Sequence, residues 1–409
     1  MAKFRISGVL NLTVLVAALG YFVDMFDLLL FPIVRQQSLA SLGISPGEQV
    51  RVGTYLLNWQ MAGMLLGGIF WGVLGDKKGR RSTLFGSIAL YSVANIGNAY
   101  AQSIPAYALW RFLAGLGLAG ELGAAVTLVS ETLPKEVRGY GTALVAAVGV
   151  FGTVIAALTG KYLFWRHAYL LGGFLGIALL FLRFGLRESL MFSSLSHSRI
   201  KRGQFLSLFT SRDRLLRYLR CILIGLPMWF IVGILVIFIP EFAPLLAVAG
   251  KPDPAVAVAC CYSGIAVGSI ISGFLSQILG TRTKVIGIFM FMAFIGVAIV
   301  LLGRGLTPLE IYVMMAWLGL ASGYWAVFVT VAAEQFGTNL RATVATTVPN
   351  FVRGAVVLIT SSFLFIKASL GMLASAWIVG LTCFAVAALS LWWMEDTHGK
   401  DLDFMEEIP

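Results

Sequence analysis

Long apolar stretches, each able to cross a lipid bilayer, constrain the fold of this chain more than any other feature. Crossing about 30 Å of hydrocarbon takes about 20 apolar residues in a helix. Because 59% of the residues are hydrophobic, the chain exceeds what a water-soluble domain carries, and the stretches lack the alternation of membrane β-strands. The sequence therefore predicts an all-α membrane protein. About twelve helices are expected near 9–33, 51–74, 82–101, 105–132, 139–163, 166–186, 215–245, 254–279, 285–303, 308–335, 342–367 and 371–393.

Two motifs recur in the second half of the chain, which indicates a duplicated unit. The glycine-rich basic segment Gly72–Arg81 returns in weaker form 201 residues later as Gly273–Arg282. A glutamate and an arginine seven residues apart, Glu131 and Arg138, return 203 residues later as Glu334 and Arg341. We therefore expect two six-helix bundles related by pseudo-two-fold symmetry. The predicted divisions are a first bundle 1–186, a cytoplasmic linker 187–214, a second bundle 215–393 and a cytoplasmic tail 394–409.

The net charge of +11 is explained by membrane topology. Lys and Arg concentrate in the predicted loops on the side of both termini, whereas Arg35 is among the few placed in loops on the other side. Positive loops stay in the cytoplasm, so both termini are predicted to be cytoplasmic, in a multi-pass protein of the bacterial inner membrane. The lipid bilayer then accounts for the basic residues, and no nucleic-acid partner is expected.

Cysteine, histidine and glycine patterns give no support for an enzyme. The four cysteines lie within predicted helices without zinc or disulfide spacing, and the three histidines lie at loops or helix ends. No phosphate-binding loop of a nucleotide-driven protein is present. We expect no enzymatic activity, no metal and no cofactor.

Three segments carry a resemblance to a known family. Gly72–Arg81 resembles the signature loop between helices 2 and 3 of the major facilitator superfamily, and Arg111–Glu121 resembles helix 4 of its metabolite:proton symporter and sugar porter groups. Asp24 and Asp27 resemble the acidic pair in helix 1 of related organic-acid porters. The resemblance implies the twelve-helix fold, alternating access and a monomeric protein.

Charged residues inside predicted helices are costly and so indicate function. Asp27 and Arg111 each lie about six residues from the outer end of their helices, which places both at similar depth, about 9 Å at 1.5 Å per residue, and lets them pair. Such a pair can bind and release a proton, or it can be a static salt bridge. Asp24, one turn away, and Glu121, deeper in helix 4, are alternative proton carriers.

Arg353 is the charge that lies well inside the second bundle, where a guanidinium facing a central cavity would bind a carboxylate. The alternative is pairing with Glu334 or a backbone carbonyl. Helix 7 reads Gly225–Trp229 without the glutamines of sugar porters, which argues against a hexose. Aromatic and amide residues expected to complete the substrate site are Tyr21, Asn58, Gln60, Asn95, Trp229, Tyr262, Tyr324, Trp325 and Asn350.

A cytoplasmic gate is predicted from the duplicated motifs. Basic residues beside Asp76 can reach carboxylates on the cytoplasmic rim and hold one conformation closed. Gln277 replaces the acid in the second copy, so a weaker latch is expected there. The predicted gate residues are Asp76, Arg80, Arg81, Glu131, Arg138, Glu334 and Arg341.

Together these features predict a proton-coupled symporter that imports a small anionic or zwitterionic organic solute by alternating access. Its partners are a small-molecule substrate, the proton and the bilayer. The helix expected at 139–163 lacks the proline typical of drug:proton antiporters, which favours uptake. An exporter, a uniporter or a solute sensor that does not transport remain alternatives.

Overall fold

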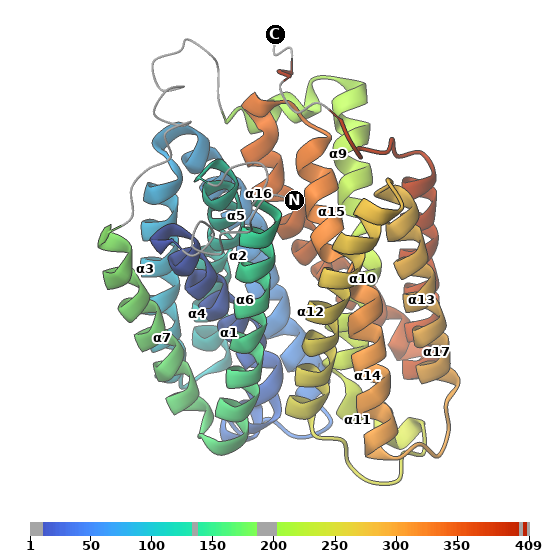
Figure 1. The fold of residues 1–409 in the computed structure, drawn as a ribbon. Coiled ribbons are helices and arrows are strands. Elements are labelled where there is room, and N and C mark those ends of the chain that lie inside the picture. The colour runs from blue at the N-terminus through green and yellow to red at the C-terminus, as the bar shows by residue number, and fades with distance from the viewer. Residues whose placement is uncertain (1–10, 133–137, 186–202, 401–403, 407–409) are drawn as a thin grey trace.

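The computed structural model describes residues 11–132, 138–185, 203–400 and 404–406, and these residues contain helices and connections but no strand. The side chains of several residues in α5, α6 and α16 also fall outside this description. Figure 1 shows helices running roughly side by side along one axis. In chain order they are α1 (Leu12–Ser41), α2 (Gln49–Lys78), α3 (Arg80–Ala99), α4 (Ile104–Leu118), α5 (Glu121–Thr132), α6 (Arg138–Tyr162), α7 (Trp165–Leu182), α9 (Arg212–Ile224), α10 (Leu226–Phe230), α11 (Ile239–Leu245), α12 (Pro254–Ile278), α13 (Thr283–Leu302), α14 (Pro308–Ser322), α15 (Trp325–Glu334), α16 (Thr338–Gly354) and α17 (Val356–Trp392).

The helices fall into two groups that lie next to each other (Figure 1). In the first half, α1 packs on α6, α2 on α4 and α3 on α7; in the second half, α12 packs on α14 and α15 on α16. Contacts between α2 and α16 and between α6 and α12 join the halves. Most of the predicted linker, residues 187–202, lies outside the described residues, so the predicted bundle boundaries remain predictions.

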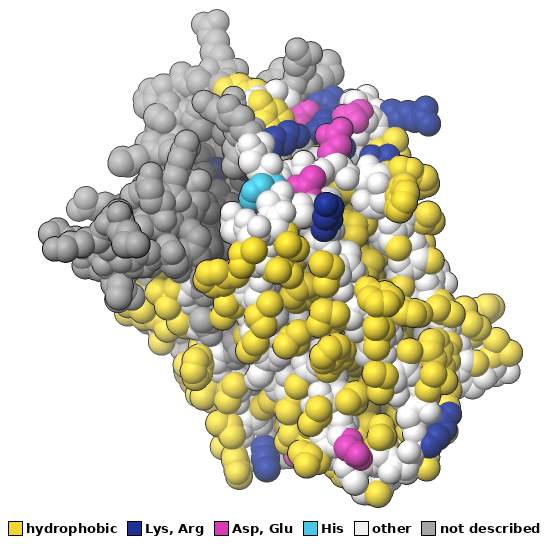
Figure 2. Space-filling model, turned by 45° about the vertical axis from the view of Figure 1, so that its right-hand side comes forward, with side chains coloured by type: hydrophobic (Ala, Val, Ile, Leu, Met, Phe, Trp, Pro, Cys, Tyr) yellow, Lys and Arg dark blue, Asp and Glu magenta, His cyan; other side chains and the backbone are white. Residues whose placement is uncertain are grey.

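The surface between the two ends of the molecule is apolar. Eight helical segments of the described residues are long and apolar enough to cross a membrane, and one of them, Asn339–Trp392, contains two crossings separated at Gly371. Figure 2 shows a broad hydrophobic band with charged side chains gathered towards the ends. Large apolar side chains on the helices are exposed, for example Phe274 on α12 and Phe291 and Leu302 on α13. Among the described residues, each of the twelve predicted ranges corresponds to a helix or to an interrupted helix such as α9–α11. The prediction of a multi-pass, all-α membrane protein with twelve crossings is confirmed.

Two of the predicted helices are interrupted at equivalent places. The helix expected at 105–132 is divided into α4 and α5 at Ala119–Gly120, and the one expected at 308–335 is divided into α14 and α15 at Gly323–Tyr324. The two breaks are 204 residues apart, close to the offset of the sequence motifs. The duplication therefore extends to the local irregularities of the helices.

Glycines at matching positions allow close helix packing in both halves. A Cβ atom on Gly63 would lie 2.1 Å from the Phe112 carbonyl oxygen on α4, and one on Gly264 would lie 2.2 Å from the Ala316 carbonyl oxygen on α14. Small residues let membrane helices approach closely, since no hydrophobic effect drives them together within lipid. The contacts of α2 with α4 and of α12 with α14 are thus duplicated copies of one packing solution.

The first helix is longer than predicted, and this changes the position of Arg35. α1 continues to Ser41 instead of ending near residue 33. Arg35 therefore lies within a helix and is only 1% exposed, so its assignment to an external loop was wrong. Its burial is possible because α2 carries Gly53 at this level, where a Cβ atom would lie 2.7 Å from Arg35 Cδ.

The second copy of the basic motif forms a clamp within its own half. Arg282 Nη2 and Nε donate to the two carboxylate oxygens of Glu334 at 2.9 and 3.1 Å, and Thr397 donates to the same carboxylate. Asp396, just after α17, accepts the backbone N–H groups of Arg282 and Thr283. In this copy Asp396 supplies a carboxylate that Gln277 cannot, but these contacts stay inside the second half, so the weaker latch expected here remains a prediction.

We expect Asp396→Asn to lower thermal stability. Partial burial alone would raise the pKa of Asp396, but hydrogen bonds from Thr281, Thr283 and the His398 backbone outweigh it and hold the pKa well below its usual range. A carboxylate at the N-terminus of a helix such as α13 contributes about 1 kcal/mol, or a few °C. Because the folded pKa is lowered, this stabilisation is fully present above the unfolded pKa of about 4, decreases below it and is lost only as pH falls through the lower folded pKa. Unfolding in detergent at pH 7 and pH 3 should show a smaller difference between the two proteins at pH 3 than at pH 7; an equal difference at both values would contradict this role.

Candidate functional site

Two buried carboxylates on α1 lie near the middle of the molecule. Asp24 and Asp27 are both 0% exposed, and neither oxygen of either side chain has a hydrogen-bond partner among the described residues. An ionised carboxylate without a partner is expensive in a dry environment. These two carboxylates are therefore candidates for binding a proton or for contacting a ligand.

Arg111 on α4 lies near Asp27 but is held by neutral partners. It donates to Asn95 Oδ1 at 3.4 Å and Asn98 Oδ1 at 3.3 Å on α3, and to Gln60 Oε1 at 3.2 Å on α2. Its guanidinium carbon also lies 4.9 Å from the centre of the Tyr169 ring. The ion pairs of the described residues do not include Asp27 with Arg111, so the predicted direct pair is absent. Gln60 and Asn95, predicted to bind substrate, instead surround this arginine.

Glu121 occupies a closed ionic cluster within the first half. Arg183, which follows α7, donates to Glu121 Oε1 at 2.9 Å and to Oε2 through its other terminal nitrogen. Ser87 on α3 donates to the same carboxylate, and all three residues are at most 1% exposed. This pairing distinguishes Glu121 from the two unpartnered aspartates on α1.

A second group of buried polar residues lies where the halves meet. Arg353 on α16 is 1% exposed; it donates to Asn350 Oδ1 at 3.4 Å, and its Nε has no partner among the described residues. Its guanidinium carbon lies 5.9 Å from the centre of the Trp229 ring. Asn350 in turn donates to the Ala119 carbonyl at 2.9 Å, across to the break between α4 and α5. The predicted alternative of an Arg353–Glu334 pair is not observed, because Glu334 binds Arg282.

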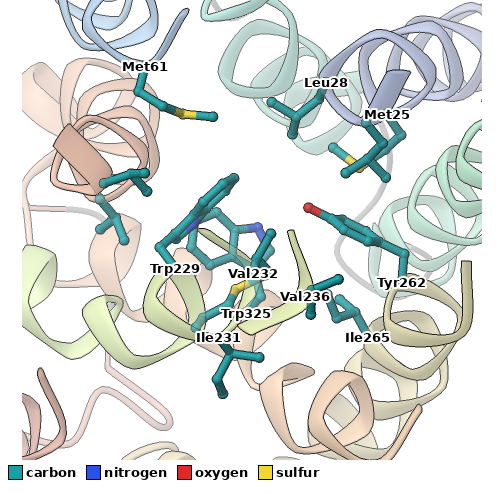
Figure 3. Close-up of a cluster of buried hydrophobic side chains, with 14 of the residues drawn as sticks. Met25, Leu28, Met61, Trp229, Ile231, Val232, Val236, Tyr262, Ile265 and Trp325 are labelled. Atoms are coloured by element: carbon teal, nitrogen blue, oxygen red, sulfur yellow. The ribbon is translucent and has the colours of Figure 1, made fainter. Parts of the chain in front are cut away.

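A narrow apolar chamber lies beside this group, between α1 and α2 on one side and the second half on the other. Tyr262 on α12 and Trp229 on α10 form part of its wall, and neither the Tyr262 hydroxyl nor Trp229 Nε1 has a hydrogen-bond partner among the described residues. Figure 3 shows the Tyr262 hydroxyl pointing into the space between Trp229 and Leu28, with Trp325 packed beside Trp229. The other lining residues are Leu28, Leu29, Pro32, Leu57, Met61, Val232, Gly233, Ile237 and Val356.

The remaining predicted substrate residues differ in position. Tyr21 lies on α1 one turn before Asp24, and its ring fills the space left by Gly149 on α6. Asn58 on α2 accepts a hydrogen bond of 2.6 Å from Thr360 on α17 and so joins the two halves. Tyr324 donates to the Ile224 carbonyl at 3.1 Å inside the second half, which gives it a packing role away from the chamber.

One end of the interface between the halves is closed by the first basic motif; we call it the Asp76 end. Asp76 accepts a hydrogen bond from Thr343 on α16, and Arg80 lies 3.7 Å from its other carboxylate oxygen and donates to the Gly75 carbonyl. Arg81 lies 5.5 Å from the centre of the Phe85 ring, and Arg341 donates to the Ala333 carbonyl. The side chains of Glu131 and Arg138 lie outside the described residues.

An ion pair that the sequence did not predict closes the opposite end, which we call the Arg35 end. Arg35 Nη2 lies 2.8 Å from Glu241 Oε1 on α11 and also donates to the Ile237 carbonyl, both in the second half. Its other terminal nitrogen donates to the Gln49 carbonyl at the start of α2. With inter-half contacts at both ends and zero exposure of Asp24 and Asp27, the structure is an occluded arrangement.

We expect Arg35→Gln to favour opening of the Arg35 end. Loss of a charge-assisted hydrogen bond costs about 1.5–3 kcal/mol, which shifts an equilibrium by roughly 10-fold or more. Spin labels on Gly47→Cys and Lys251→Cys, in a variant without the four native cysteines, would report the distance between the halves. Longer distances should gain population in Arg35→Gln and Glu241→Gln. Arg51→Gln, which breaks an exposed pair with Glu48 inside the first half, is the control; equal behaviour of Arg35→Gln and Arg51→Gln would contradict the gate.

Comparisons with known proteins agree with this architecture. The chain is 32% identical over 162 residues to the niacin transporter NiaP of Acinetobacter baylyi, a match covering 39% of this chain and 36% of the relative. It is 25% identical over 280 residues to the sialic acid transporter NanX of Escherichia coli, covering 65% of each. The chain thus matches less than half the length of the niacin transporter. A solved structure of a D-xylose–proton symporter superposes with a TM-score of 0.70 at 17% identity, covering 95% of this chain and 99% of that one.

A family model extends the match over most of the chain. The model described as Major Facilitator Superfamily matches residues 16–360, which include both unpartnered aspartates, both duplicated motifs and Arg353. The twelve crossings, the duplicated halves and the occluded centre between them are the features expected of that family. The chain therefore belongs to the major facilitator superfamily.

Proposed function

We propose that this protein is a proton-coupled symporter that imports a small anionic or zwitterionic organic solute across the bacterial inner membrane. The observation that carries the proposal is the pair of fully buried, unpartnered carboxylates of Asp24 and Asp27 beside a site that contains Arg353. Relatives named as niacin and sialic acid transporters and a structural neighbour named as a D-xylose–proton symporter support it.

The mechanism follows from the two closed ends. Opening of the Arg35 end, taken as the outer side, admits solute and proton while the Thr343–Asp76 contact holds the other end shut. Protonation neutralises a carboxylate on α1, and the solute anion neutralises Arg353, so the loaded centre carries less unpaired charge than the empty one. Burial of unpaired charge is costly. Rocking of the loaded halves is therefore favoured, and the Asp76 end opens to the cytoplasm, where both termini are proposed to lie.

Uptake into proteoliposomes tests the proposal. The purified protein would be given an inward proton gradient of one pH unit and offered benzoate, phenylalanine, uridine and glucose in turn. If one proton enters with each solute anion, the solute concentration inside can exceed that outside by up to about 10-fold. This limit follows because a gradient of one pH unit is a tenfold ratio of proton concentrations. Accumulation above that of protein-free liposomes, into which undissociated benzoic acid diffuses by itself, should vanish when an ionophore dissipates the gradient. Equilibration without accumulation of every solute would indicate a uniporter instead.

A further inference from the structure

We propose that the substrate is a compact aromatic monocarboxylate whose ring occupies the apolar chamber and whose carboxylate binds Arg353. This inference rests on the proposed function and narrows the solute class of the same site. Its basis is the combination of unpartnered hydrogen-bond donors with an apolar, aromatic wall in one buried place.

The donors define the charged end of the ligand. Arg353 Nε, Trp229 Nε1 and the Tyr262 hydroxyl are all buried without a partner among the described residues. Buried donors are normally satisfied, and an orphaned one costs free energy. Trp229 and Tyr262 line the chamber, and the Arg353 guanidinium carbon lies next to it, 5.9 Å from the centre of the Trp229 ring. Donors so placed suit an acceptor-rich ligand, and a carboxylate accepts several hydrogen bonds while matching the fork of a guanidinium.

The chamber defines the body of the ligand. Its walls beyond Trp229 and Tyr262 consist of aliphatic side chains, a methionine and glycine, such as Leu28, Met61 and Val356. A sugar buried there would leave several hydroxyls unpaired, which is strongly unfavourable. The free space in this arrangement is about that of one water molecule, so a ring enters only when the two sides of the chamber move apart. The aromatic side chains would then favour stacked and edge-to-face contacts with a flat ring.

The position of Asp24 bears on the choice between an acid and an amino acid. Asp24 lies within electrostatic reach of Arg353, on the opposite side of the interface between the halves. An ammonium group on the ligand would pair with Asp24, one of the two carboxylates proposed to take up the proton, and so would compete with proton coupling. An aromatic acid without an amine leaves Asp24 available to the proton, whereas a zwitterion does not.

Equilibrium binding to the purified protein in detergent tests the inference without any gradient. Benzoate, cyclohexanecarboxylate, benzamide, phenylalanine and glucose would be compared by calorimetry at equal concentrations. We expect benzoate to bind tightest, cyclohexanecarboxylate more weakly, and benzamide, phenylalanine and glucose at least 10-fold more weakly than benzoate. Tighter binding of phenylalanine, glucose or benzamide than of benzoate would overturn the inference. Because no transport is required, proton-driven uptake of another solute class would leave the proposed function intact.

Variants locate the binding. Arg353→Gln should weaken benzoate by about 30-fold or more while leaving benzamide unchanged, since only the charged hydrogen bonds are lost. Arg353→Lys, which keeps the charge but loses the fork, should give an intermediate loss and guards against misfolding of the first variant. Trp229→Leu should remove the preference for benzoate over cyclohexanecarboxylate. The control is Arg304→Gln, because Arg304 lies on an exposed loop and its side chain donates to the carbonyls of nearby residues. Unchanged benzoate affinity in both Arg353 variants would contradict the assignment.

Discussion

Replacing Asp27 with asparagine should abolish accumulation of solute while leaving the protein folded. Asp27 is fully buried without a hydrogen-bond partner among the described residues, so asparagine, which is neutral and of the same size, removes the titrating group without creating a cavity. In proteoliposomes with a pH gradient of one unit, the accumulation ratio should fall from up to about 10 to 1. Downhill exchange of solute should persist, because it requires binding and rocking but no proton.

Asp24→Asn is the companion variant. Since Asp24 lies one turn from Asp27, they titrate as a coupled pair, and each single variant reports on the pair. Glu48→Gln removes an exposed carboxylate of the first half and serves as the control. If gradient-driven accumulation survives in Asp24→Asn and Asp27→Asn alike, the proton site lies elsewhere.

Breaking the Glu121–Arg183 pair should give the largest loss of stability. Both side chains are buried, and removal of one partner leaves an uncompensated charge, at a cost of about 3–5 kcal/mol. Glu121→Gln and Arg183→Met should each lower the thermal midpoint in detergent strongly. The double variant should recover much of the loss, because no unpaired charge then remains.

The same variants test the predicted proton-carrying role of Glu121. If the Glu121–Arg183 pair is purely structural, Glu121→Gln should lower stability, but the folded fraction should still couple solute uptake to protons. Arg51→Gln, which breaks an exposed pair, should change stability by less than about 1 kcal/mol. A stable Glu121→Gln protein that exchanges solute but no longer accumulates it would instead make Glu121 the carrier.

The crossings and the duplication could be predicted from sequence because they depend on local patterns. A span of about 20 apolar residues identifies a crossing whatever packs against it. The offset of 201 residues between the basic motifs also governs the glycine pairs at Gly63 and Gly264. Those glycines were visible in the sequence, and a search for small residues at equal offsets would have found the packing.

The choice of partners could not be predicted, because it depends on which helix faces meet. Arg111 and Asp27 have similar predicted depths, yet Asn95, Asn98 and Gln60 project towards the arginine and satisfy it. Arg183 was not singled out from the sequence, although it lies inside the stretch predicted as 166–186, where the cost of intramembrane charge indicates that an arginine needs an acidic partner. No local pattern identified Glu121 as that partner.

The gate at the Arg35 end was missed for a related reason. The helix was expected to end near residue 33, which placed Arg35 in solvent, whereas α1 continues to Ser41. Glu241 lies near the end of the stretch predicted as 215–245, where a charge is not costly, and it was not predicted to form an ion pair. The pairing of Arg35 with Glu241 depends on how the two halves meet. The sequence shows only that Gly53 leaves room for a side chain beside it.

The movement of protons with solute tests the central claim most directly. Proteoliposomes in weak buffer, with no initial pH gradient, would receive the solute that gave the highest uptake, and the external pH would be followed. Proton symport through the aspartates predicts that the medium becomes more alkaline as solute enters, and that the Asp24→Asn, Asp27→Asn double variant takes up solute without this change. Entry of solute into wild-type proteoliposomes with no rise in external pH would contradict proton coupling.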